Sequence, residues 1–188
     1  MLDVREPDLF GEWNGTVYGV RDGLVLAGWT MPGKDGHSED DPVWSVHDIT
    51  TGALRASMTC DLRLPTKLFA KREYPVVTSA GGRYLAAGPV AFDLNEERGV
   101  CLATDGDRKT IALTSIRDDG TAYGVVDSEA GTDGSPLIAQ VDLTTSAGRA
   151  EVLDVGVEAP LYIDLTGQGL FLRRDENENV RVSLRQES

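Results

Sequence analysis

Short apolar stretches separated by glycine-containing turns run through the whole chain. Four segments place two apolar runs around a tight turn: 17–26 with Asp22-Gly23, 76–85 with Gly81-Gly82, 116–123 with Asp119-Gly120, and 163–172 with Gly167. Asp-Gly and Gly-Gly pairs tolerate the positive φ angles that a two-residue hairpin turn requires. The pattern therefore predicts four β-hairpins.

A second motif follows each of the first three hairpins: an aspartate beside hydrophobic residues, with a glycine a few positions later. The copies are centred on Asp48, Asp93 and Asp142, and the spacing is 45 residues from the first to the second and 49 from the second to the third. A period of about 40 to 50 residues built from short strands is typical of β-propellers, in which each repeat is one four-stranded sheet.

Together the two motifs predict an all-β fold, a β-propeller-like array of about four four-stranded antiparallel blades in one domain, residues 1–188. The units cover approximately residues 14–62, 74–104, 110–156 and 160–188. The fourth unit ends before its last strand, and segment 2–10 is the predicted closing strand, since an open strand leaves unpaired backbone groups. Three arrangements fit: a closed four-bladed ring, a half-propeller that pairs with a second copy as a homodimer, and a fragment of a larger propeller.

Some of these turns resemble those of known propeller families. Segments 79–86 and 117–123 resemble the Ser-x-Asp-Gly turn of WD-repeat-like and YVTN-type propellers, and segment 46–54 resembles the Asp-x-x-Thr-Gly-x-Leu turn of quinoprotein-type propellers. The chain departs from WD repeats because it has no Trp-Asp dipeptide. The resemblance implies a propeller scaffold and gives no site residues, because these motifs form turns.

The composition of the chain limits the classes of partner that we expect it to bind. The chain has 18 lysines and arginines against 31 aspartates and glutamates, a formal net charge of -13, which repels the phosphate backbone of nucleic acids. No stretch approaches the roughly 20 apolar residues of a membrane-spanning helix, so we expect a soluble protein without membrane insertion. The compartment is left open: cytoplasmic, or extracytoplasmic if a signal segment has been removed. Cys60 and Cys101 are expected to be free thiols, because they lie on different units at different distances from their turns.

Binding is expected where the long connections gather. In a propeller the B–C and D–A connections share one face, and here they are 31–42, 61–75, 105–109, 127–136, 156–160 and 175–179. The insertion between the first two units mixes apolar and basic residues, which suits a protein or peptide partner; its candidate contact residues are Arg63, Lys67, Phe69, Lys71 and Arg72. Alternatively, Trp29 and Trp44 flank the first long loop and stack a glycan or small ligand, with or without calcium. Packing within the core is the competing interpretation of both tryptophans.

Signals for catalysis and metal binding are weak. The chain has no Gly-x-Ser-x-Gly, Walker, His-Glu-x-x-His or Cys-x-x-Cys motif, and His47 and Asp48 point to opposite faces of a strand. Segments 127–134 and 175–179 are acidic enough for calcium, but are better explained as polar turns. We therefore expect a non-enzymatic binding scaffold without cofactor or metal. A third hypothesis, weaker than the first two, is a hydrolase-like propeller with carboxylates around its central channel.

Overall fold

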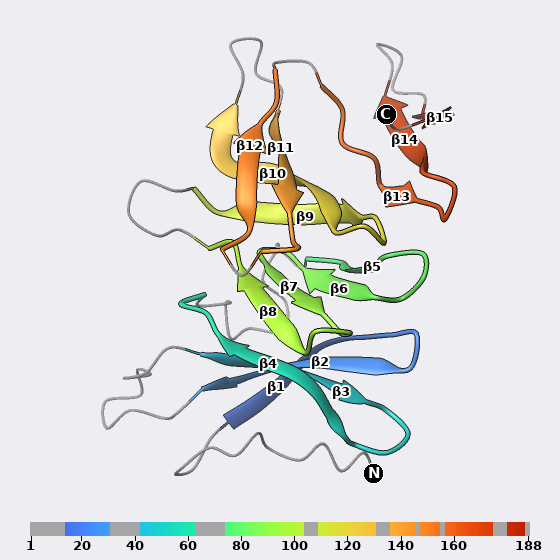
Figure 1. Ribbon diagram of the computed structural model, residues 1–188. Coiled ribbons are helices and arrows are strands. Elements are labelled where there is room, and N and C mark those ends of the chain that lie inside the picture. Colours follow the sequence, from blue (N-terminus) through green and yellow to red (C-terminus); the bar gives the residue numbers. More distant parts are fainter. Residues whose placement is uncertain are drawn as a thin grey trace.

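The structure is a computed structural model that describes residues 14–30, 42–62, 74–103, 109–130, 136–145, 147–154, 157–174 and 180–186; for 128–130 and 173–174 only the backbone is described. Every regular element in these segments is a β-strand (Figure 1). The all-β prediction is confirmed. None of the described segments forms a helix long and apolar enough to cross a membrane.

The described strands form an eight-stranded, a four-stranded and a three-stranded sheet. The eight-stranded sheet has the order β1-β2-β3-β4-β8-β7-β6-β5, with β1 at Asn14–Arg21, β2 at Leu24–Thr30, β3 at Val43–Asp48, β4 at Leu54–Thr59, β5 at Val76–Thr78, β6 at Tyr84–Ala87, β7 at Val90–Asp93 and β8 at Arg98–Cys101. The four-stranded sheet has the order β12-β11-β10-β9, with β9 at Ile111–Ile116, β10 at Thr121–Ala130, β11 at Pro136–Asp142 and β12 at Arg149–Val152. The three-stranded sheet has the order β13-β14-β15, with β13 at Tyr162–Ile163, β14 at Gln168–Arg174 and β15 at Val180–Gln186.

All four predicted hairpins are present. They join β1 to β2, β5 to β6, β9 to β10 and β13 to β14, each as an antiparallel pair. The first turn shows why the Asp-Gly pair predicted it: Asp22 has φ 49° and Gly23 has φ 78°, the left-handed conformation that matches the twist of the flanking strands. The strand groups β1–β4, β5–β8, β9–β12 and β13–β15 lie within the four units expected from the sequence.

The first two strand groups form one sheet rather than two. A parallel pairing of Ser57 with Arg98 joins β4 to β8, and the two end strands, β1 and β5, also lie in contact. Thr78 Oγ1 donates to Asp22 Oδ2 at 2.9 Å between the turn after β1 and the end of β5. The eight-stranded sheet is therefore nearly closed and barrel-like, an arrangement that the turn pattern did not predict.

The free-thiol prediction is wrong, because Cys60 and Cys101 form a disulfide with their Cα atoms 5.6 Å apart. The register explains it: each cysteine lies three positions beyond one of the paired residues Ser57 and Arg98, on strands that run in the same direction. Comparing each cysteine with its own turn missed this neighbourhood. The disulfide fixes the junction between β4 and β8.

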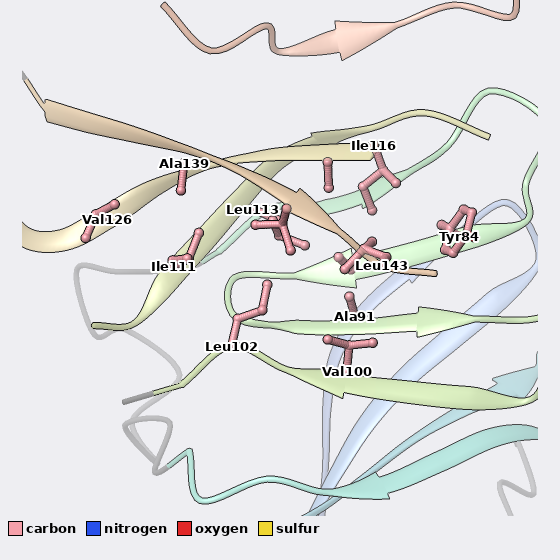
Figure 2. Close-up of a cluster of buried hydrophobic side chains, with 13 residues drawn as sticks. Tyr84, Ala91, Val100, Leu102, Ile111, Leu113, Ile116, Val126, Ala139 and Leu143 are labelled. Carbon is pink, nitrogen blue, oxygen red and sulfur yellow. The ribbon is translucent and has the colours of Figure 1, made fainter. Parts of the chain in front are cut away.

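The two largest buried clusters pack the first three strand groups together. One packs Leu26, Trp44 and Val46 of β2 and β3 against Leu85 and Phe92 of β6 and β7. The second lies on the other side of β5–β8, where Tyr84, Ala91 and Val100 face Leu113, Ile116 and Leu143 of the four-stranded sheet (Figure 2). Strands β6 and β7 are consequently buried on both faces.

The three-stranded sheet lies beside the four-stranded sheet and far from β1–β4, as the orange and red strands in Figure 1 show. Its first strand, β13, contacts β9, and Thr114 Oγ1 of β9 donates to the carbonyl of Pro160 at 3.3 Å. The described strand groups therefore follow one another through space in sequence order.

Candidate interaction surface

The repeated aspartate stabilises turns. Asp48 Oδ1 accepts hydrogen bonds from the backbone N–H groups of Thr50 and Thr51, both at 2.9 Å, and Asp142 Oδ1 accepts one from the Thr144 N–H at 2.8 Å. Backbone and threonine hydrogen bonds lower the pKa of Asp48, and the Thr144 hydroxyl and N–H lower that of Asp142. These oxygens serve the turn, so the hydrogen bonds explain the repeated aspartate by its structural role.

A buried polar chain crosses the first strand group. Trp29 Nε1–H donates to Ser45 Oγ at 2.7 Å, and Ser45 Oγ lies 2.8 Å from His47 Nε2. The Gly52 carbonyl, 3.4 Å from His47 Nδ1, can only accept, so the proton of the neutral imidazole lies on Nδ1 and Nε2 accepts from the Ser45 hydroxyl. Burial lowers the pKa of His47. Ser45 and His47 are fully buried. This row of hydrogen-bonded side chains therefore orders the interior, and a substrate cannot reach it.

The two candidate tryptophans do not converge. Trp29 pairs with Val43 and Trp44 pairs with Gly28, and because adjacent strand positions point to opposite faces, the two indoles lie on opposite sides of the sheet. Trp29 is 9% exposed and Trp44 is 1% exposed. The ring of Tyr18 packs 4.8 Å from that of Trp44, centroid to centroid. Both indoles are thus placed as core residues, and a role for them in ligand binding is still only a prediction.

Other predicted sites lie outside the described residues. This applies to all five contact residues of the basic insertion, Arg63, Lys67, Phe69, Lys71 and Arg72, to the predicted closing strand 2–10 and to the acidic segment 175–179. Their roles are still predictions. Within the described residues, no three histidine, cysteine or acidic side chains gather to hold a metal ion.

A charged cluster links the eight-stranded and four-stranded sheets. Asp93 is 1% exposed and accepts from Arg83 Nε at 3.1 Å and Nη2 at 2.8 Å. Arg98 Nη2 lies 3.9 Å from Asp93 Oδ2 and donates to the Leu143 carbonyl at 2.9 Å. Burial, and then the charge of Asp93, raise the pKa of Tyr84 to about 12. The hydrogen bonds of this cluster join protein groups, which makes it structural.

The three-stranded sheet has a different character, because its apolar side is open. Antiparallel pairing places Leu170 opposite Leu184, Leu172 opposite Val182, and Tyr162 opposite Leu170, so their side chains share one face with that of Val180. We call this set the apolar face: Tyr162, Leu170, Leu172, Val180, Val182 and Leu184. Val180, Val182 and Leu184 are 58%, 63% and 60% exposed, and Tyr162 and Leu172 are 43% and 47% exposed.

The other side of this sheet is buried at β13 and β14, whereas Arg181 and Arg185 of β15 are exposed there. Ile163 and Phe171 are 1% and 3% exposed, and the Arg185 guanidinium lies 4.8 Å from the centre of the Phe171 ring. Arg185 also forms an ion pair with Glu158 at 3.1 Å. The sheet thus packs inward with a few aromatic, aliphatic and arginine contacts and turns its aliphatic rows outward.

Charge also sets this sheet apart. Strands β14 and β15 contain four arginines and no aspartate or glutamate, whereas the whole chain has a net charge of -13. The alternation of valine, leucine and polar residues along 180–186 is the sequence signal that could have found this surface. It is typical of a strand and does not say which side of the strand is open.

No family model matches this chain, and no curated protein shows significant sequence similarity to it.

Proposed function

We propose that the protein is a non-enzymatic β-scaffold that binds a protein partner, and that the apolar face of the three-stranded sheet makes the contact. The observation that carries the proposal is the row Val180, Val182 and Leu184, each more than half exposed on one side of β15. A scaffold of rigid sheets around such a face needs no reactive group.

The size of the face supports this role. Its exposed side chains offer on the order of 500 Å² of apolar surface, within the range of about 300 to 600 Å² in which the largest patch of a monomer is often functional. Leaving that surface in water forfeits about 25 cal/mol per Å² that burial against a partner would recover. The absence of carboxylates from β14 and β15 lowers the desolvation cost of covering it.

The propeller-type array is part of the proposal. Four antiparallel strand groups follow in sequence order, and the first strands of neighbouring groups, β1 and β5, β5 and β9, and β9 and β13, lie in contact. Contacts between the innermost strands of successive blades are what a radial arrangement requires. The basic insertion with Arg63, Lys67, Phe69, Lys71 and Arg72 is proposed as a second contact region for a protein or peptide.

The disulfide bears on the compartment. Bonds such as Cys60–Cys101 persist in oxidising environments and are rare in the cytosol of most organisms. This favours the extracytoplasmic alternative, where a secreted or surface-exposed scaffold meets its partner.

Photo-crosslinking tests the proposed contact. We would place benzoylphenylalanine at position 182, in the middle of the apolar face, and at position 151 as the control, because Glu151 is exposed on β12. Irradiation in native extract should give a discrete protein adduct from position 182 that disappears when Leu184→Arg is added. The proposal fails if position 182 gives no adduct, or if position 151 gives the same one.

A further inference from the structure

We infer that the partner covering the apolar face is a second copy of this chain, packed through the same face about a two-fold axis. This inference rests on the proposed function, because it assumes that the face binds protein. It adds the identity of the partner and the symmetry of the contact.

The first argument is shape and chemistry. The centre of the face is a twisted sheet surface of aliphatic side chains, with Gln168 and Gln186 at one end by the same register. Its natural complement is another such surface, since two sheets pack face to face at about 10 Å with strand directions about 30° apart. A two-fold contact uses the same patch on both partners. The rows Val180, Val182, Leu184 and Leu170, Leu172 supply ridges and grooves for interdigitation on both copies.

The second argument concerns the alternative of a ring. In a head-to-tail ring, the last sheet of one copy would pack on the first strand group of the next, on the side turned away from β5–β8. Most of that side is buried, with Val25, Ala27, Ser45 and His47 at most 2% exposed, but Val17 and Val20 of β1 share it by register and are 58% and 56% exposed. A ring would therefore need Val17, whereas the two-fold contact does not, and the variants below separate the two arrangements.

The third argument is charge. Two copies with a net charge of -13 each repel one another over most of their surfaces, and they can approach most easily where carboxylates are absent. Strands β14 and β15 themselves contain no carboxylate, although three acidic residues lie in segment 175–179 between the two strands. Added salt screens the remaining repulsion, so self-association should strengthen with salt. Binding of an acidic partner to the arginines of this sheet would weaken instead.

The apolar area that each copy offers sets the strength of the self-association. About 500 Å² from each copy gives on the order of 1,000 Å² in total, the lower limit for a specific interface. We therefore expect a reversible dimer whose population depends on protein concentration.

The test is the solution mass of the full chain, measured by sedimentation and light scattering over a wide concentration range at low and high salt. The wild type should approach twice the 20.2 kDa of one chain, more completely at high salt. Val182→Arg should give one-chain mass at every concentration. The matched control is Val17→Arg, which changes an equally exposed valine on β1 and should dimerise like the wild type.

A charge-swap experiment tests the two-fold geometry. Val182→Arg and Val182→Glu should each be monomeric alone, because like charges would meet across the axis, and the mixture should recover the two-chain mass. Circular dichroism of each variant should match the wild type, since the position is exposed. Recovery in the mixture cannot come from a folding defect.

The outcomes separate this inference from the proposed function. A monomeric wild type at all concentrations, a dimer that survives Val182→Arg, loss of the dimer in Val17→Arg, or masses beyond two chains would each overturn the inference. If the wild type is monomeric but position 182 still crosslinks to another protein, the proposed function survives alone. If there is neither dimer nor adduct, or the adduct joins two parts of one chain, both fail.

Discussion

Strands β6 and β15 show two opposite uses of apolar residues. In β6, Tyr84–Ala87, all four consecutive residues are buried, because one face packs on β2 and β3 and the other on the four-stranded sheet. In β15 apolar and polar residues alternate, a pattern that normally places the polar side in water. Here the apolar side is outside as well: Val180, Val182 and Leu184 are exposed, and so are Arg181 and Arg185 on the side that Ser183 shares with Phe171. A contiguous apolar run thus determines its burial, whereas an alternating one leaves the choice of open face to the neighbouring elements.

The largest effect is expected when an aromatic residue is removed from a strand that is buried on both faces. Phe92 in β7 has no exposed surface, so Phe92→Ala should lower the free energy of unfolding by about 3 to 5 kcal/mol through lost burial and a cavity. Urea denaturation measures it. Leu165→Ala is the control, at a 74% exposed position near β13, and should change stability by less than about 0.5 kcal/mol. Equal losses in the two variants would contradict the contrast.

Cutting the disulfide should have the next largest effect. Cys60 and Cys101 are 41 residues apart in sequence, and releasing a loop of that length costs about 2 to 4 kcal/mol. The double variant Cys60→Ala, Cys101→Ala should show this loss in urea. Hydrogen exchange should rise in β4 and β8 and change little in the three-stranded sheet. Faster exchange confined to β13–β15 would contradict the assignment of the bond to the junction.

Local chemistry made the hairpins predictable. The φ angles of Asp22 and Gly23 are a property of those two residues, and the same holds for the hydrogen bonds of Asp48 and Asp142 to their own turns. The pairing of Ser57 with Arg98 is different, because it depends on where two distant strand groups come to rest. No local motif carries that information, so the joined sheet and its disulfide were missed.

The same limit explains the candidate sites. Trp29 and Trp44 flank one loop in sequence, but the register of β2 against β3 separates them onto opposite faces. The alternation around Val182 was visible, yet its exposure depends on Phe171 packing to the other side. Sequence therefore predicted the hairpin of β13 and β14 and did not predict the surface that these strands form with β15.

Acidification should act on the first strand group and not on the last sheet, because His37 and His47 are the only histidines. Burial lowers the pKa of His47 below its ordinary 6.5, so its contribution to stability is complete above pH 6.5 and is lost as the pH falls through the folded-state pKa. One ionisable group is involved, so we expect a smaller effect than that of the disulfide. Urea midpoints between pH 7 and 5 measure it.

His47→Gln is the variant for this measurement, since glutamine does not titrate. Its stability should depend less on pH in that window than that of the wild type. The turn aspartates titrate below their ordinary 3.8, so they do not contribute there. Identical pH profiles for His47→Gln and the wild type would contradict the assignment.

We expect a smaller loss of stability when the aspartate of the repeated turn is replaced. Asp142→Ala removes the acceptor for the Thr144 N–H and hydroxyl, which should cost about 1 kcal/mol. Asp154→Ala is the control, because Asp154 is exposed and outside the repeated motif. The turn before β14 repeats the arrangement at Asp164, which accepts from the Thr166 N–H at 2.8 Å. A loss for Asp154→Ala as large as that for Asp142→Ala would show that the turn bonds contribute nothing.

The last comparison pairs two valines that differ in burial, and its exposed member should show the smallest effect on stability of all the variants other than the controls. Val46 has no exposed surface and Val182 is 63% exposed. Valine and threonine have nearly the same shape, so the substitution adds a hydroxyl without leaving a cavity. Val46→Thr buries that hydroxyl and should cost about 1 to 3 kcal/mol. Val182→Thr should change the stability of the single chain by less than about 0.5 kcal/mol.

The same pair separates folding from association. At protein concentrations where the wild type is dimeric, Val182→Thr should shift the dimerisation midpoint to higher concentration, although its single-chain unfolding is unchanged. Val46→Thr should do the reverse, with lower stability and an unchanged midpoint while it is folded. If Val182→Thr destabilised the single chain as much as Val46→Thr, the apolar face would belong to the core, and the contrast between β6 and β15 would be wrong.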